Sequence, residues 1–130
     1  MRRILERSLL VVLGAIISCG GDGSGPSGPT PGNLTIQLNT SATNVGAVKF
    51  LIRGGTVSGV TSSYSTFDSP VPSGNHRVVV LGDLTAGTVA TISVPDTRQA
   101  ASYSATVEEV ATRQTYALQS SGGFTMTIGE

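Results

Sequence analysis

Several residue types that carry chemistry are scarce in this chain of 130 residues. It holds one cysteine, one histidine and no tryptophan, and charged residues make up only 12% of it. A single cysteine cannot form an intramolecular disulfide, and together with one histidine it cannot complete a structural zinc site. Long hydrophobic runs are missing as well, since the apolar stretch Leu9–Ile17 is about half the length that a transmembrane helix needs. These absences argue against a disulfide scaffold, a Cys/His metal centre and a spanning helix.

The titratable residues give no sign of catalysis. His76 opens an expected strand beside Arg77, and we expect it at a strand edge in solvent. As a general base it would need a carboxylate to orient it and a nucleophile within reach, and no motif supplies them. No two carboxylates are paired in the way that a glycosidase needs. We therefore expect no enzyme, no catalytic residue and no cofactor.

The acidic residues are scattered along the chain. Asp83 and Asp96 stand in segments typical of turns, and the spacing of an EF-hand loop is missing. No metal site is predicted, although a calcium ion held by Asp68, Asp83 or Asp96 is left open.

The charge balance also argues against a nucleic-acid partner. Without the first 18 residues, five basic side chains stand against seven acidic ones, a formal net charge of about −2. The sequence has no stripe of basic residues that could bind the phosphate backbone of a nucleic acid.

The N-terminus has the composition of a signal peptide. Arg2, Arg3 and Arg7 precede the apolar run, and the small residue Ser18 follows it. The four residues Ile16–Cys19 resemble the bacterial lipobox, which implies that Cys19 is lipidated and becomes the first residue of the mature chain. Acyl chains on Cys19 would provide a stable membrane anchor. The alternative is a secreted protein cleaved near Ser18 that keeps a free thiol.

The resemblance also implies a location in the cell envelope. By the sorting rules of such lipoproteins, an Asp directly after the Cys retains the protein in the inner membrane. Gly20 stands there instead, and Asp22 comes later, which favours the outer membrane over the inner one.

Composition divides the remainder into a linker and one domain. Residues 19–33 are rich in Gly, Ser and Pro and cannot contribute to an apolar core, so we expect a tether there. The predicted organisation is a signal peptide at 1–18, the lipidated Cys19 with its linker at 19–33, and a β domain at 34–130.

The domain is expected to be all-β. Short runs of Val, Ile, Thr and Tyr are separated by Gly, Ser, Asn and Pro, and no window has a clear helical stripe. Such spacing without crossover helices predicts an antiparallel β-sandwich. The nine expected strands are Leu34–Asn39, Ala47–Arg53, Val57–Ser62, Tyr64–Phe67, His76–Leu81, Thr88–Val94, Ser102–Ala111, Thr115–Leu118 and Phe124–Ile128.

Alternation within these strands predicts which residues are buried. Val48, Phe50 and Ile52 are expected to face the core while Lys49 and Arg53 face solvent. The run Val78–Leu81 is apolar at every position, so we expect a central strand covered on both faces, although a dimer seam is the alternative.

Five segments resemble the pattern of cohesin domains: Gly46–Ile52, Val57–Val60, His76–Leu81, Gly87–Ile92 and Phe124–Ile128. The resemblance implies a nine-stranded jelly-roll of the kind related to carbohydrate-binding modules. The chain departs from the pattern at Arg53-Gly54-Gly55, where cohesins usually carry a Tyr-Asp-Pro turn. Partner-contact residues cannot be matched position by position, so the ligand-binding residues stay unknown.

The resulting hypothesis is a non-enzymatic lipoprotein that displays a cohesin-like sandwich on a stalk for protein recognition or envelope assembly, with an unidentified protein partner. The alternative is a cell-surface module that binds polysaccharide, which Tyr64 and Phe67 would serve if exposed, whereas Phe50 and Phe124 are expected in the core. A third hypothesis is an accessory subunit of an enzyme complex. A row of exposed aromatic residues on one face would favour sugar, and a flat face of aliphatic and small polar residues would favour protein.

Overall fold

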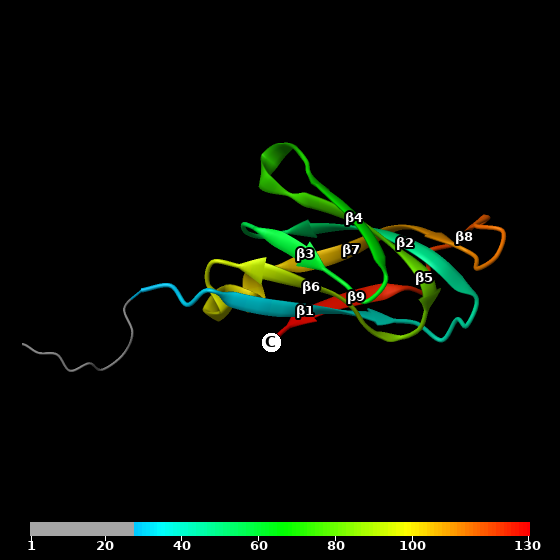
Figure 1. Cartoon of the computed structure of the whole chain (residues 1–130), viewed down its shortest axis with the longest axis horizontal. Coiled ribbons are helices and arrows are strands. Elements are labelled where there is room, and N and C mark those ends of the chain that lie inside the picture. The colour runs from blue at the N-terminus through cyan, green and yellow to red at the C-terminus, as the bar shows by residue number, and fades with distance from the viewer. Residues whose placement is uncertain (1–27) are drawn as a thin grey trace, which may run out of the picture.

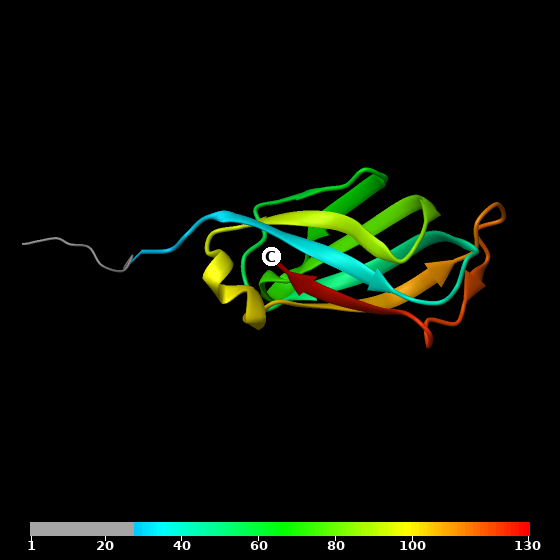
Figure 2. The ribbon, with the colours of Figure 1, turned by 90° about the horizontal axis from the view of Figure 1, so that it is seen from below.

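The computed structural model describes residues 28–130, and they form two antiparallel β-sheets packed face to face (Figure 1, Figure 2). Cys19, the expected signal peptide at 1–18 and most of the expected linker at 19–33 lie outside the described residues. The strands are β1 (Gly32–Asn39), β2 (Val45–Arg53), β3 (Gly59–Thr61), β4 (Ser65–Pro70), β5 (His76–Leu84), β6 (Gly87–Val94), β7 (Ser104–Ala111), β8 (Leu118–Gln119) and β9 (Thr125–Gly129). Two short 3₁₀ helices, η1 (Pro72–Gly74) and η2 (Thr97–Ser102), complete the described part.

The nine strands divide into a four-stranded sheet A and a five-stranded sheet B. Sheet A has the order β3-β6-β1-β9, and sheet B has the order β4-β5-β2-β7-β8. Every pair of neighbouring strands is antiparallel. The expected all-β antiparallel sandwich is therefore confirmed.

Period-two alternation places one face of each sheet in the core. On β2, Val48, Phe50 and Ile52 are at most 1% exposed, as expected, whereas Lys49 and Arg53 point outward. Each such side chain contributes about 1.5–3 kcal/mol by leaving water. Phe50 and Phe124 lie in the core, as expected. The fully buried side chains of the core are Phe50, Leu34, Ile36, Leu38, Ile52, Leu84, Ile92, Val45, Val48, Val78, Val80 and Val89.

Each of the nine expected strands has an observed counterpart with shifted bounds, and the shift has an identifiable cause in two of them. The expected strand Thr115–Leu118 is wrong for all but its last residue, because residues 112–117 form a turn in which the backbone N–H groups of Tyr116 and Ala117 bond to Thr112. The strand expected from Ser102 begins at Ser104, because Ser102 ends the helix η2.

The run Val78–Leu81 is covered on one face only, which corrects the expectation of burial on both. Val78 and Val80 are completely buried, but Val79 and Leu81 are half-buried. They lie on the outward surface of sheet B, and no other layer of the described residues packs there.

The chain enters the sandwich at a fixed point. Residues 28–31, here called the strap, hydrogen-bond to the start of η2: Thr97 donates from its backbone N–H to the Thr30 carbonyl (2.8 Å), and Arg98 donates from Nη2 to the Gly28 carbonyl (2.6 Å). Both views show the strap beside η2 at one end of the sandwich and the turns around β8 at the opposite end (Figure 1, Figure 2). The fold therefore has an entry end and a far end.

Asp96 organises the entry end. Its carboxylate caps η2 by accepting from the Arg98 backbone N–H, and it accepts a further bond from the Thr30 backbone N–H. Hydrogen bonds from the Arg98 guanidinium, with help from those backbone donors, lower the pKa of Asp96 to about 2. Asp96 thus ties the strap to the domain together with Thr97 and Arg98.

Within residues 28–130, no helix is both long and apolar enough to cross a membrane.

Candidate binding surface

The outward faces of the two sheets differ in chemistry. Cross-strand pairing shows which side chains share each face, because directly opposed residues of neighbouring strands point to the same side. The outward positions of sheet A are polar or glycine: Asn33, Thr35, Gln37, Gly59, Thr61, Thr91, Ser93, Thr125 and Thr127. The outward positions of sheet B combine an apolar centre with polar and charged surroundings, and they are called the outer B face below: Phe67, Val79, Leu81, Ala47, Leu51, Ala111 and Leu118, with Arg53, Ser65, Ser69, Ser104, Thr106, Lys49, Arg77, Glu108 and Glu109.

The outer B face is organised in cross-strand rows. One row runs from Phe67 on β4 through Val79 and Lys49 to Glu109 on β7. The next row toward the far end runs from Leu81 through Ala47 and Ala111 to Leu118 on β8. On β4 this row continues to Ser65, so an apolar strip crosses β5, β2, β7 and β8, and Phe67 lies beside its β4 end in the neighbouring row.

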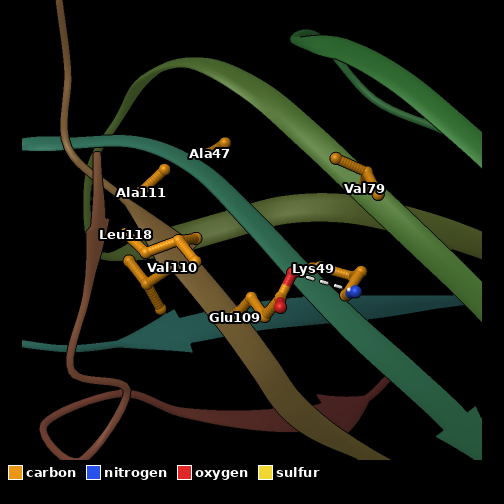
Figure 3. Close-up of a pocket in the computed structure, with 7 residues that line it drawn as sticks. All are labelled: Ala47, Lys49, Val79, Glu109, Val110, Ala111 and Leu118. Carbon is orange, nitrogen blue, oxygen red and sulfur yellow. Dashed lines mark ion pairs between the residues drawn. The ribbon is translucent and has the colours of Figure 1, made fainter. Parts of the chain in front are cut away.

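A hollow of about 150 Å³ opens in this strip (Figure 3). Ala47 and Ala111 are cross-strand partners, and their short side chains leave the space empty. Leu118 borders the hollow on one side, and the Lys49–Glu109 pair borders it on the other (Figure 3). The hollow is lined by Ala47, Lys49, Val79, Glu109, Val110, Ala111 and Leu118.

Lys49 and Glu109 form an ion pair across the strands β2 and β7. Lys49 Nζ lies 2.9 Å from Glu109 Oε1, and the two side chains are 33% and 51% exposed. A pair as exposed as this contributes about 0–1 kcal/mol. Its main effect is to place one charge of each sign at the rim of an apolar hollow.

A second ion pair lies on the part of the outer B face nearer the entry end. Arg77 donates from Nε and Nη2 to the two carboxylate oxygens of Glu108, at 2.8 and 3.0 Å. These hydrogen bonds lower the pKa of Glu108 and raise that of Arg77. Glu108 can reach across because it is the extra residue of a β-bulge, between Val107 and Glu109, which pair with Phe50 and Lys49.

Phe67 stands out of the outer B face at the opposite edge from Leu118. It is on the edge strand β4 and is 67% exposed. The expectation that Phe67 could be exposed is confirmed. Tyr64, considered with it, is half-buried against the core, and its ring occupies the space where a Cβ on Gly82 would lie.

The far end of the sandwich carries another exposed aromatic side chain. Tyr116 is 51% exposed and has a left-handed backbone with φ of 54°. Gln114 in the same turn also has a positive φ, of 74°. Residues other than glycine seldom adopt such angles, and the hydrogen bonds of Thr112 within the turn hold them there.

His76 is buried, so the expectation that it lies in solvent is wrong. It shares the inward face of β5 with Val78 and Val80, and its Nε2 lies 2.7 Å from Asp68 Oδ2 on β4. A carboxylate partner is therefore present, which the sequence analysis missed. Among the described residues, no serine, threonine or cysteine side chain hydrogen-bonds to His76.

The three aspartates considered for calcium lie apart. Asp68 contacts His76, Asp83 Oδ1 lies 3.2 Å from Arg113 Nε, and Asp96 binds Arg98 and the strap. Asp83 belongs to strand β5 and not to a turn, which corrects its expected place. In the described part of the chain, no three His, Cys, Asp or Glu side chains gather in a way that could hold a metal ion.

Tyr103 fills the gap beside the Gly54-Gly55 turn. Its hydroxyl donates to the Thr56 carbonyl at 2.7 Å, and burial, followed by the charge of Asp96, raises the pKa of Tyr103. A Cβ on Gly55 would lie 2.7 Å from the Tyr103 ring, so a larger residue there would displace the ring and its hydrogen bond to Thr56. Tyr103 is thus a structural residue, and it offers no platform for a ligand.

The hollow on the outer B face is not evident from the sequence. Ala47 stands at a position of β2 that alternates away from the core, and this was the available signal. Its pairing with Ala111, far along the chain, follows only from the register of β2 and β7. No protein-family model, no curated protein and no solved structure matches this chain.

Proposed function

We propose that this chain is a non-enzymatic lipoprotein that is anchored through Cys19 and binds a protein through the outer B face. The observation that carries the proposal is the contrast between the two outward faces. Sheet A presents threonine, serine and amide side chains, whereas sheet B presents aliphatic side chains around a hollow, flanked by charged, serine and threonine side chains. Contiguous exposed apolar surface on a small domain marks an interaction site.

The chemistry of the outer B face fits a protein better than a sugar. Its apolar strip is aliphatic except for Phe67, and charges of both signs stand at its rim. Protein interfaces combine an apolar centre with a polar rim, and a few anchor side chains in pockets supply most of the binding energy. A sugar-binding surface would instead present a row of aromatic rings, and Tyr64 and Tyr103 pack into the domain.

The position of the strap at one end of the sandwich supports display of the domain from a membrane. The strap lies at the entry end, so a lipid on Cys19 would attach the domain through that end and leave the far end free. Gly20 after Cys19 favours the outer membrane of the cell envelope. We further propose that the strands follow the nine-stranded jelly-roll pattern that the cohesin resemblance implies.

A cell-surface carbohydrate-binding module is the second candidate. The exposed ring of Tyr116 at the far end favours it, because an aromatic face can stack on a sugar ring. Tyr116 belongs to a turn, apart from the outer B face, so variants separate the two functions.

The test compares two variants of the full chain in bacterial envelopes. Phe67→Ser with Leu118→Ser alters the outer B face, and Thr61→Ser with Thr127→Ser is the matched control on sheet A, since all four side chains are outside the core. Binding to envelope proteins that is lost only in the first variant supports the proposal. Binding to a polysaccharide panel that survives this variant but is lost on Tyr116→Ala would favour the carbohydrate module.

A further inference from the structure

We propose that the edge strand β4 binds an extended segment of the partner protein, which adds to sheet B as a further antiparallel strand beside Phe67. This inference rests on the proposed function, because it names the part of the outer B face that the partner contacts and the conformation that the partner adopts. It follows from the unpaired backbone of β4, from a recess beside Phe67 and from a comparison of β4 with the other sheet edges.

The backbone of β4 has hydrogen-bonding groups on the side that faces away from β5. In an antiparallel pair, successive residues direct their N–H and C=O groups alternately toward the paired strand and away from it. Pro70 has no N–H, so its pair with His76 is one in which the two residues exchange no hydrogen bonds. The next pair agrees, because the Val71 N–H donates to the Asn75 carbonyl at 2.9 Å. Every second residue of β4, counted back from Pro70, therefore directs its backbone groups to the free edge.

This free edge carries the N–H and C=O groups of Thr66 and Asp68 and the C=O group of Pro70. No strand of residues 28–130 pairs with these groups, since β4 is the last strand of sheet B on that side. Backbone groups in this arrangement are the ones that an extended peptide uses when it adds a strand to a sheet. The edge therefore selects an extended backbone as its occupant, and it excludes proline from the two partner positions that donate to the carbonyls of Thr66 and Asp68.

The other sheet edges are less suited to strand addition. The edge strands β3 and β8 have only three and two residues. The edge strand β9 contacts β7 and η2, and the part of β7 beyond β8 contains the bulge at Glu108. In contrast, β4 pairs with β5 over six residues in unbroken register and lies at the margin of the molecule (Figure 1). It has no lysine and no bulge, the devices that usually protect an edge.

Asp68 is the only charged residue of β4, and it lies opposite Val78 on the inner face of sheet B. An inward charge usually guards an edge, because an added strand would bury it without a partner. Here Asp68 Oδ2 lies 2.7 Å from Nε2 of the buried His76. The histidine supplies the partner in advance, so an added strand that covers Asp68 leaves no unpaired charge.

A recess of about 240 Å³ lies beside Phe67, and it is called the β4 recess below. The outward side chains of an added strand lie opposite Phe67 and Ser69, in pairs without hydrogen bonds, where side chains approach most closely. Because Ser69 is small, a large apolar side chain opposite it reaches over Ser69 into the recess and contacts the Phe67 ring. We therefore expect an aliphatic or aromatic residue of the partner at this position. The β4 recess is lined by Phe67, Asp68, Ser69, Arg77 and Val79.

A second copy of this chain fits the edge less well. The register that pairs Thr66 with the second copy's Asp68 places the second copy's Ser65 opposite Ser69, which leaves the β4 recess empty. A shift by two residues pairs Thr66 with a proline, which has no N–H to donate. The linker of this chain, residues 19–33, has no large apolar side chain and contains three prolines. The occupant is therefore a segment of another protein.

The experiment places the photoreactive residue p-benzoylphenylalanine at position 67 of the full chain, expressed in bacteria and irradiated in its membranes. We expect a cross-linked product with another protein. The cross-linked segment of that protein should carry a large apolar residue and no proline at the positions that pair with Thr66 and Asp68. The control places the same probe at Thr61 on sheet A, where this product is not expected.

Thr66→Pro tests the backbone contact. This substitution removes an N–H from the free edge and leaves the hydrogen bonds between β4 and β5 in place, as Pro70 does. The product should fall at least roughly tenfold, about what a loss of 1.4 kcal/mol in association gives. Thr66→Ala removes the same side chain but keeps the N–H, so it is the matched control and should leave the product unchanged.

Hydrogen exchange tests the same contact without a proline in the strand. In the purified product, the backbone N–H groups of Thr66 and Asp68 should exchange at least roughly tenfold more slowly than in the chain before irradiation, since each would be paired. The N–H groups of β9, on the opposite sheet, should exchange as before. This comparison decides the proposal even where Thr66→Pro also lowers stability.

Several results would overturn the strand addition: no product, a product of this chain with itself, an equal product from the Thr61 probe, unchanged exchange at Thr66 and Asp68, or a product that a folded Thr66→Pro chain retains. A product that survives Thr66→Pro but is lost on Leu118→Ser leaves the proposed function intact, because the partner then binds the outer B face through side chains alone. Absence of any product, together with polysaccharide binding that depends on Tyr116, would overturn the proposed function as well.

Discussion

Arg77 and Glu108 form an ion pair across strand β2, to which neither residue belongs. Arg77 is on β5, Glu108 is on β7, and β2 runs between the two strands with Leu51 paired to Arg77. Leu51 points to the outer B face, yet it is only 6% exposed and is not part of the core between the sheets. The ion pair therefore forms a polar cover over an apolar residue that lies on an otherwise open surface.

Because the ion pair covers Leu51, we expect truncation of Leu51 to destabilise the domain more than is usual for a residue outside the core between the sheets. Leu51→Ala should lower the free energy of unfolding by about 2 kcal/mol, the lower end of the range for a buried leucine. Leu118→Ala on the same face should change it by less than about 0.5 kcal/mol, because Leu118 is 71% exposed. Denaturant unfolding of both variants measures the difference, and equal effects would contradict the cover.

Asp96 predicts a dependence of stability on acid. Its pKa in the folded chain is about 2, below the ordinary value of 3.8, so its contribution is complete above about pH 3.8 and is lost as the pH falls toward 2. Wild type should therefore exceed Asp96→Asn in stability near neutral pH, and the gap should narrow over that acidic window. Thermal unfolding across the pH range measures it. Because Arg98 is the main cause of the low pKa, Arg98→Met should weaken the same dependence, and an unchanged profile would show that Asp96 acts through the backbone donors alone.

Two glycines are required by close contacts of the backbone. Gly54 has a φ of 106°, and a Cβ there would lie 1.8 Å from the Ser102 carbonyl oxygen. Gly54→Ala should cost at least about 2 kcal/mol, since strain and overlap add. Gly46→Ala meets the Thr112 carbonyl oxygen at 2.6 Å and should also destabilise the domain. Gly123→Ala, with no atom within 4 Å of its Cβ position, is the control that should unfold like wild type.

Cys19 predicts how the chain is held in the envelope. Cys19→Ala should shift the protein from the membrane fraction to the soluble fraction, because the acyl chains have no other attachment residue in this sequence. Mass spectrometry of the wild-type N-terminus should find a lipidated cysteine as its first residue. A membrane-bound Cys19→Ala chain, or an unmodified thiol in wild type, would show that the lipobox resemblance misleads.

Much of the fold could be predicted because alternation is a local signal. The pattern of Val48, Phe50 and Ile52 is visible in the sequence, and burial follows it in the structure. His76 has the same parity as Val78 and Val80, so its burial was also within reach, but its polarity favoured solvent. The turn after β7 could not be predicted, because the side chain and backbone of Thr112 replace strand hydrogen bonds where β propensity favoured a strand.

The candidate site was harder to predict than the fold, because it depends on which strands are neighbours. Val79 and Leu81 look like core residues in the sequence, and only the order of sheet B shows that one of their faces is uncovered. Ala47 and Ala111 form a hollow because their strands pair in one particular register. The bulge that brings Glu108 to Arg77 is likewise a property of the pairing, with no local signal in either residue.

The strap also determines how the domain would bear mechanical tension. A pull from the membrane on a bound domain enters through Gly28 and Thr30 and passes directly into β1. Since β1 lies between β6 and β9 in sheet A, the load is directed along the strands and is shared by two antiparallel ladders. Ladders loaded in this shearing direction must break many hydrogen bonds together, whereas a strand peeled from its end loses them one at a time. The hydrogen bonds of Asp96 and Arg98 would thus be the first to yield, and they would protect β1 and the outer B face from small forces.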